Sequence, residues 1–511
     1  NFNFHKLSTY FDFLSYRLIV IPFILTIMGQ KILIVGSGPS GLSSISVLSK
    51  LKNYEITLID NSNFQLKEKS ADCYFKNTFE LGNRITNDEV IFDNQYSNYY
   101  QNDLPDISKS FGGFSNVWGG TISEMNEKDS LIYHELGINL QEDYKEIYQL
   151  INTTTKKISE DIPNFLKNKF INNTMARINN LENKTIKANF SNIALKNDLI
   201  IDELAEQQIC KFCKSYKWYC SNTPIWSSKD QMRKIIKLKN IKYLENTRLI
   251  KFTEEKEDVR CLLTKNNESY LKEFSKVVLA SGPIATSTIM INSGIVDKAE
   301  LQNTDLYSIP FVKIFNFEIN KSSFADLFIN FRSNEHDFFI QLYNFSRGLM
   351  YLGKDAVSIV KYVNKLPDFC FSFLGGLFIY IDSQFSSKLL VRLNKNTQKI
   401  EFERVNSIFQ GEINSQLKKL SRLLLFVGVK PLKILTKKYL FGTSNHYGAQ
   451  FPHSKYKNGD TSDLKGRIKN IRNVHIVDSS VLPKIHSGPL TLTTMANSNR
   501  ISKLITSELT E

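Results

Sequence analysis

Residues 31–60, KILIVGSGPSGLSSISVLSKLKNYEITLID, constrain the fold more than any other part of this 511-residue chain. The apolar run at 31–35 predicts a buried parallel strand, and a glycine-rich turn at 36–41 follows it. The stretch 42–51 predicts a helix, and 55–59 predicts a second strand. Strand, turn, helix and strand in this order form a βαβ unit, so the sequence predicts an α/β fold with a Rossmann-like parallel sheet.

The glycines of the turn and the acid that ends the unit each have a physical role. Gly36 permits the tight turn, Gly38 lets the backbone approach a pyrophosphate, and Gly41 lets the helix pack closely on the strand. The N-terminus of the helix offers free N–H groups and the positive end of its dipole to the same anion. Asp60 would accept hydrogen bonds from a ribose hydroxyl and repel a ribose phosphate. The unit therefore predicts a dinucleotide site that disfavours NADP.

The length and the 42% apolar composition allow a large core and predict two closely associated domains. The net charge is +14. Because Lys and Arg are spread along a chain rich in Asn, Ile and Lys, a compositional bias is favoured over an anionic substrate, a nucleic acid or an acidic membrane surface. No basic run interleaved with aromatic residues occurs, so no nucleic-acid partner is expected.

The cysteines and the N-terminus bear on location. Six cysteines are too few and too uneven for a disulfide framework in a chain of this length, which predicts a reducing, cytoplasmic location. The apolar run at 18–27 resembles the core of a short signal peptide but is too short to span a bilayer. No small-residue cleavage site precedes Met28. We expect residues 1–27 to be an upstream extension and Met28 the native start, with a membrane anchor as the disfavoured alternative.

The remaining patterns predict more sheet structure. A second glycine-rich segment, FGGFSNVWGG at 111–120, lets backbone lie against a flat ligand. The pattern at 139–200 is mostly helical, and 241–265 and 272–280 predict strands that rejoin the nucleotide-binding sheet. A helix through residue 291 follows them.

Alternating and continuous aromatic runs occur in the middle of the chain, from about Tyr307 to Arg404. Those at 338–343 and 369–381 predict strands of a second sheet. The second domain is therefore expected to be sheet-based and to cover a substrate.

Taken together, these segments resemble, in order, the glucose-methanol-choline (GMC) family of flavin oxidoreductases. The resemblance rests on four stretches: 36–41, 112–120, VVLASGP with SGI at 277–295, and NVHIVDSSVLP at 473–483. It implies a discontinuous Rossmann-like FAD-binding domain over 28–300 and 441–511, with a partly helical insert at about 121–240. It also implies a substrate-binding domain with an antiparallel sheet (α+β) over 301–440.

The same resemblance implies a set of cofactor contacts. Gly36, Gly38 and Gly41 would hold the FAD pyrophosphate, and Asp60 the adenosine ribose. The isoalloxazine side would be lined by Gly112, Gly113, Ser115, Asn116 and Gly119. Asp478 and Ser479 would contact phosphate and flavin, and 491–495 would begin the closing helix. No His or Cys occurs at 112–120 to bond covalently to the flavin, so non-covalent FAD is expected.

The family's catalytic histidine falls on His446. This base would take the alcohol proton while a hydride moves from the same carbon to flavin N5, a role that suits imidazole. Many family members have His or Asn at the position where this chain has Pro489, or Gly488 with a shift of one residue. Neither can act as acid or base, so His486 is the candidate substitute. His453 is expected to be structural, and His475 to lie in a strand.

Three cysteines resemble a cysteine-rich segment of bacterial members of the family. These are Cys210, Cys213 and Cys220, with Tyr216 where another cysteine would complete C-x2-C-x2-C-x3-C. Because three ligands suit neither a stable four-iron cluster nor a zinc site, we predict that the three cysteines are structural thiols or a relic, with no metal.

The sequence thus predicts an FAD-dependent alcohol dehydrogenase or oxidase acting on a CH–OH group, of bacterial, choline dehydrogenase-like type. The resemblance implies an alcohol, sugar or polyol as the small-molecule substrate. O2, a quinone and a cytochrome all stay open as electron acceptor. Two alternatives remain: a flavin-dependent nucleotide-sugar mutase or isomerase without net oxidation, and a catalytically degenerate flavoprotein, with which Pro489 is consistent.

Overall fold

The computed structural model describes residues 30–62, 108, 110–116, 118–151, 169–181, 185–194, 225–266, 268–315, 317, 325–344, 367–397, 399–439, 442, 444–456 and 459–511. The expectations for residues 1–27, for Met28 and for the cysteine trio Cys210, Cys213 and Cys220 lie outside these residues. Within the described part, no helix is both long and apolar enough to cross a membrane.

A five-stranded parallel sheet contains the dinucleotide unit. Its strand order is β19-β8-β1-β2-β4. The strands are β1 (Lys31–Val35), β2 (Glu55–Ile59), β4 (Ile241–Leu244), β8 (Lys276–Leu279) and β19 (Val474–Ile476). The side chains of β1 and β2 are almost entirely buried, which explains their continuous apolar runs. The predicted Rossmann-like parallel sheet is confirmed.

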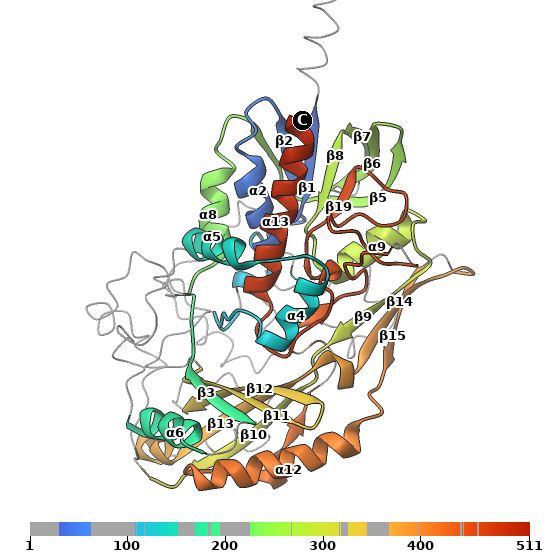
Figure 1. The fold of residues 1–511 in the computed structure, drawn as a ribbon. Helices are drawn as coiled ribbons and strands as arrows, with labels where there is room; N and C mark the ends of the chain where they lie inside the picture. Colours follow the sequence, from blue (N-terminus) through green and yellow to red (C-terminus); the bar gives the residue numbers. More distant parts are fainter. Residues whose placement is uncertain are drawn as a thin grey trace, which may run out of the picture.

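Helices cover this sheet. Figure 1 shows the closing helix α13 (Thr491–Thr510) running beside α2 (Pro39–Leu48), with α5 (Gln141–Ile151) and α8 (Ser228–Ile235) next to them. Serines allow the close contact of α2 with α13: Ser44 Oγ lies 2.9 Å from Ser498 Oγ, and Ser43 Oγ donates to Met495 O at 2.7 Å. The predicted helix through residue 291 is α9 (Pro283–Asn292).

A separate three-stranded sheet corrects one expectation. Of the segment 241–265, only β4 joins the parallel sheet. The strand β6 (Asp258–Lys265) pairs on one side with β5 (Thr247–Glu255) and on the other with β7 (Glu268–Phe274). The pairing is antiparallel throughout. A two-residue turn joins β5 to β6, with Lys256 at φ 47°. So short a connection allows only a hairpin, since parallel strands need a long crossover.

The second large sheet has seven strands, all paired antiparallel. The strands are β3 (Ile186–Phe190), β10 (Leu306–Lys313), β11 (Leu327–Ser333), β12 (His336–Asn344), β13 (Leu374–Ile381), β16 (Val429–Pro431) and β17 (Lys437–Lys438). The predicted antiparallel sheet of the middle region is therefore confirmed. One face packs on α6 (Lys169–Asn179) and α12 (Gln410–Phe426), both below the sheet in Figure 1.

Two boundaries in this sheet differ from expectation. The run at 369–381 begins as a 3-10 turn, η4 (Asp368–Phe373), and the strand starts only at Leu374. Because the apolar pattern is unbroken across residues 373 and 374, it did not mark this change. The mostly helical pattern of 139–200 also conceals β3, whose burial alternates along the strand as expected for a sheet edge.

A further sheet has four strands in the order β15-β14-β9-β18. Its strands are β9 (Lys298–Asn303), β14 (Lys388–Asn394), β15 (Lys399–Val405) and β18 (Tyr447–Gly448). Only Thr304 and Asp305 separate β9 from β10 of the seven-stranded sheet. β9 is the neighbour of β18, the strand that follows His446. Through Thr304 and Asp305, β9 is therefore connected directly to the second large sheet.

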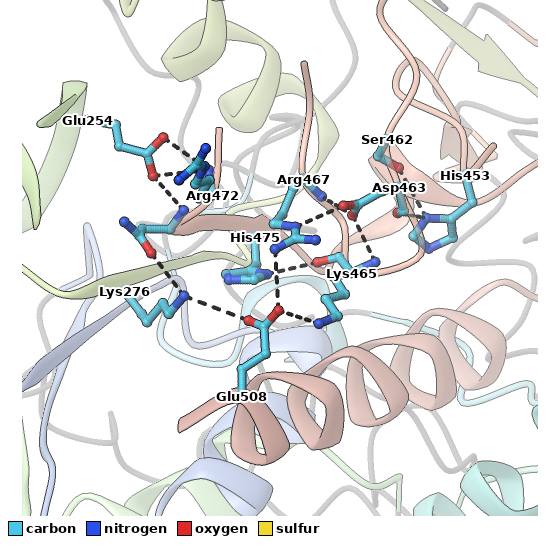
Figure 2. Close-up of polar contacts among 11 residues, drawn as sticks. Glu254, Lys276, His453, Ser462, Asp463, Lys465, Arg467, Arg472, His475 and Glu508 are labelled. Carbon is cyan, nitrogen blue, oxygen red and sulfur yellow. Dashed lines mark hydrogen bonds and ion pairs between the residues drawn. The ribbon is translucent and has the colours of Figure 1, made fainter. Parts of the chain in front are cut away.

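Polar contacts fix the segment between β18 and α13 (Figure 2). Glu508 of α13 forms ion pairs with Lys465, with Arg467 (3.3 Å) and with Lys276 of β8 (3.7 Å). The ring of His453 lies with Nδ1 2.7 Å from the backbone oxygen of Asp463. His453 is thus a structural residue, and His475 lies in β19, as both were predicted.

Acidification is expected to destabilise this fold because buried histidines are held neutral. Burial lowers the pKa of His453 to about 3, with the charge of Arg500 adding to the effect, and burial lowers the pKa of His475 to about 4. An unfolded histidine titrates near pH 6.5. Between about pH 6.5 and about pH 4 the unfolded state therefore binds more protons than the folded state. The free energy of unfolding consequently decreases as the pH is lowered through this range.

Urea denaturation at several pH values measures this slope. Each histidine contributes at most about 1.4 kcal/mol per pH unit. A His475→Gln variant should show a shallower slope than the wild type between about pH 6 and about pH 4.5, because one such group is gone. Equal slopes in the two proteins would contradict the role given to His475.

Candidate active site

The three glycines of the first turn have different surroundings. A Cβ on Gly36, which has φ +105°, would lie 2.5 Å from Ala280 O, and one on Gly41 would lie 2.0 Å from Gly36 O. A Cβ on Gly38 would meet nothing within 4 Å. Gly36 and Gly41 are therefore required by packing, whereas Gly38 borders open space. Helix α2 begins there without a side-chain cap, so its first N–H groups suit an anion.

Ser37 links this turn to Asp60 and to the second glycine-rich loop. Asp60 Oδ2 accepts hydrogen bonds from Ser37 N (2.8 Å) and Ser37 Oγ (2.5 Å). The same hydroxyl oxygen accepts from Gly112 N at 2.9 Å. Burial raises the pKa of Asp60, while hydrogen bonds from Ser37 and Ser62 oppose that rise. The predicted ribose-binding carboxylate thus lies beside the turn, and one of its oxygens is already held by Ser37.

The loop at 110–116 contacts the first turn directly. A Cβ on Gly113, which has φ +60°, would lie 3.3 Å from Gly38 Cα. Ser115 Oγ donates to Gly112 O (2.6 Å), and Asn116 Nδ2 donates to Phe111 O (2.9 Å). The side chains of Ser115 and Asn116, predicted to line the flavin, thus hold the loop in shape.

The start of helix α8 packs on this loop. Ser228, at the start of α8, lies with its Oγ 3.0 Å from Ser115 Oγ. A Cβ on Gly112 would lie 2.9 Å from Lys229 Cβ, so α8 packs closely on the loop. A Cβ on Gly119 would meet nothing within 4 Å. The open positions at this site are therefore Gly38 and Gly119.

Ser479 positions the strand that follows His446, and Asp478 holds the adjoining turn against α9. Asp478 Oδ1 accepts from Ser480 N (3.0 Å) and its Oδ2 from Thr286 Oγ1 of α9 (2.6 Å). Ser479 Oγ donates to Tyr447 O at 2.9 Å. A Cβ on Gly448 would lie 2.5 Å from Ser479 O, so β18 packs tightly on this turn. The sequence analysis expected the side chains of Asp478 and Ser479 to contact the cofactor. In the structure the same side chains make these contacts within the protein.

His446 and His486 are brought together from segments forty residues apart. Burial lowers the pKa of His446 to about 3, and the charge of nearby His486 adds to this effect. Burial likewise lowers the pKa of His486. Among the described residues, His446 Nδ1 and His486 Nε2 are buried without a hydrogen-bond partner. Both rings are therefore neutral near pH 7, each with a ring nitrogen free to interact with a ligand.

An aromatic sheet face adjoins the two histidines. The ring of His446 stacks on Tyr380 of β13, with centroids 4.9 Å apart and an interplanar angle of 23°. Phe339 of β12 lies 6.3 Å from Tyr380 and 5.0 Å from Phe328 of β11, measured between centroids. These rings lie on the face of the seven-stranded sheet opposite α6 and α12, since the alternate residues of β12 pack on those helices.

A cavity of about 320 Å³ opens beside this face. The cavity is lined both by the seven-stranded sheet and by segments outside it. The sheet contributes Asn189, Phe328, Asn330 and Phe339, and the other segments contribute Ser123, His486, Ser487 and Gly488. A Cβ on Gly488 would lie 3.4 Å from His486 Nδ1. Close to Pro489, where the chain departs from the family pattern, His486 is thus a titratable group on the cavity wall, together with Glu124 and Tyr148.

Comparison with known proteins gives a match in structure. No family model matches the sequence, and no curated protein does. Among solved structures, pyridoxine 4-oxidase from Mesorbium loti aligns with 94% of this chain and 99% of its own, at TM-score 0.65 and 12% sequence identity. The fold is similar to that of an oxidase. At this identity the match establishes the fold alone.

Sequence reasoning missed three residues that organise the site. Ser37 and Ser228 hold the two glycine loops together, and Tyr380 supports the ring of His446. Ser37 lies inside the fingerprint, where only the glycines were interpreted. For Tyr380 the available signal was the alternation Phe378, Tyr380 along the strand, which marks one face of a sheet.

Proposed function

We propose that the chain is an FAD-dependent oxidoreductase that oxidises the CH–OH group of a small-molecule alcohol, sugar or polyol. The observation that carries the proposal is the neutral imidazole of His486 on the wall of a cavity lined by Phe328 and Phe339. The neutral imidazole of His446 lies near His486 and stacks on Tyr380 of the same sheet face. The fold similarity to pyridoxine 4-oxidase, by name an oxidase, supports an oxidoreductase.

The turn at 36–41 fits a dinucleotide. The space next to Gly38 and the uncapped start of α2 suit the pyrophosphate, and Asp60 lies within the same loop cluster to hold the ribose. Gly112, Gly113 and Gly119 would border the flavin ring. Bound FAD would supply the hydride acceptor for the reaction.

In this proposal His446 is the base. Its unpaired Nδ1 is neutral, so it can accept the hydroxyl proton of the substrate as the carbon loses hydride. The stack on Tyr380 fixes the plane of the ring, and the hydrogen bond from Thr304 N to His446 O (3.0 Å) fixes its backbone. His486 would hold the substrate oxygen from the cavity wall.

An anaerobic titration tests the reaction class. The purified protein is reconstituted with FAD and mixed without oxygen with a panel of sugars, polyols and simple alcohols. We expect at least one compound to bleach the flavin and to yield the matching carbonyl product. Release of the yellow cofactor by acid precipitation would separately test non-covalent binding.

The same titration separates the alternatives. A nucleotide-sugar mutase or isomerase would rearrange its substrate and leave the oxidation state of the flavin unchanged at the end. A degenerate flavoprotein would bind FAD and respond to no compound. Either result across the whole panel counts against the proposed oxidation.

A further inference from the structure

The surface at the end of α12 exposes large apolar side chains. Leu425 and Phe426, in the last turn of the helix, are 47% and 75% exposed. Ile434, in the 3-10 turn η6 (Lys433–Leu435), is 95% exposed. Ile314, which follows β10, is 48% exposed. Single exposed apolar residues are common, but a group of them marks an interaction site.

These side chains belong to one continuous region. Ile314 N donates to Gly428 O at 3.0 Å, which places Ile314 just beyond the end of α12. Lys430 of β16 pairs with Val312 of the neighbouring strand β10. Three residues later η6 begins. We refer to Ile314, Leu425, Phe426, Lys430, Lys433 and Ile434 as the α12 surface.

The region is basic as well as apolar. From residue 413 to residue 459 the chain contains no Asp or Glu. Along this stretch Lys418 and Arg422 are exposed on α12, and Lys430 and Lys433 are exposed beyond it. The nearest acid on α12 is Glu412 in its first turn, about 20 Å along the helix from Phe426, where it contacts His336.

Three of the neighbouring elements contain no acidic side chain. Neither α6 nor β10 nor β16 contains Asp or Glu, and Arg177 of α6 lies over the ring of Phe315 at 4.0 Å. Exposed Phe, Leu and Ile rimmed by Lys and Arg form the pattern of proteins that lie on a membrane surface. Lysines attract the negatively charged headgroups, while apolar side chains enter the boundary with the acyl chains.

We infer that the α12 surface docks on an anionic lipid bilayer. A second copy of the chain fits it less well, because a symmetric contact would bring its lysines face to face. A nucleic acid would leave Ile434 and Leu425 without partners, since bases stack on aromatic rings. Docking leaves the cavity clear, because α12 covers the opposite face of the seven-stranded sheet (Figure 1).

Vesicle flotation with the full chain tests the inference. One set of vesicles contains phosphatidylglycerol and phosphatidylcholine, and the other phosphatidylcholine alone. We expect the protein to float with the first set, to float at least tenfold less with the second, and to be released by high salt. Two double variants, Phe426→Ser with Ile434→Ser and Lys430→Glu with Lys433→Glu, should each lower the bound fraction at least tenfold.

A matched control changes the same residue types elsewhere. Leu271 is 64% exposed on β7, and Lys251 is exposed on β5, in the three-stranded sheet. The variant Leu271→Ser with Lys251→Glu should float like the wild type. Thermal melting of all variants checks that these surface changes leave the fold intact.

Three results would overturn the inference. The first is no flotation of the wild type with anionic vesicles. The second is flotation that survives both double variants, which would assign binding to another part of the chain, such as residues 18–27. The third is a dimer in sedimentation experiments that both double variants convert to monomer, which would make the α12 surface a contact between copies.

Discussion

Replacing His446 with alanine is expected to slow flavin reduction by substrate by about two or more orders of magnitude, the usual contribution of a general base. FAD binding should be retained, because the ring packs on Tyr380 and not on the glycine turn at 36–41. Stopped-flow absorbance of the flavin under anaerobic conditions measures the rate. Fluorescence titration with FAD measures the retained affinity.

His134→Ala is the matched control, since His134 is exposed on α4 (Glu127–Glu135), away from the cavity lining. It should reduce the flavin at the wild-type rate. If His446→Ala were also as fast as the wild type, the chain would have another base or no catalytic use for this histidine. His486→Ala would then be the variant to measure next.

Alanine at Gly41 is expected to lower the stability of the fold, whereas alanine at Gly38 is expected to lower only the affinity for FAD. The Cβ of Gly41→Ala would lie 2.0 Å from Gly36 O, a backbone atom, so the turn and α2 must separate. We expect this variant to lose about 1–3 kcal/mol of folding free energy, as overpacked sites do. The Cβ of Gly38→Ala meets no protein atom within 4 Å, so the fold should keep its stability.

The cost of Gly38→Ala should appear only with the cofactor. Its methyl group enters the space proposed for the pyrophosphate, so we expect FAD affinity to fall at least about tenfold, or about 1.4 kcal/mol. Urea denaturation without FAD and fluorescence titration with FAD separate the two quantities. Gly119→Ala, another open position, is the control for stability. Unchanged FAD affinity in Gly38→Ala would contradict the assignment of this space to the pyrophosphate.

The fold was predictable where short-range patterns determine it. The unit at 31–60 became β1, α2 and β2 because strand, turn and helix each carry a local signal within thirty residues. The hairpin of β5 and β6 was placed in the wrong sheet, since an apolar run does not reveal which strand it pairs with. The edge strand β3 was hidden for a related reason: its partner β11 lies more than a hundred residues away.

For the site, the sequence indicated residues better than their contacts. It brought out Gly36, Gly38, Gly41 and His446, whose types are tied to particular chemistry. It could not show that the side chains of Ser115 and Asn116 turn inward. Ser115 forms a hydrogen bond with Ser228, and Asn116 accepts one from Ser227; both serines lie at the start of a helix that is distant in the sequence. Nor could it show that His446 meets Tyr380, since that contact depends on how two sheets are joined.

The dipeptide between β9 and β10 has a consequence for how the protein moves. Thr304 N donates to His446 O at 3.0 Å, and Asp305 O accepts from Ile381 N, next to Tyr380, at 3.0 Å. Asp305 is also held by Lys438 at 2.8 Å. Thr304 and Asp305 therefore form hydrogen bonds both with His446 and with β13, the strand on which its ring stacks. These hydrogen bonds oppose a hinge motion between His446 and β13, so the fold itself holds the proposed base in place.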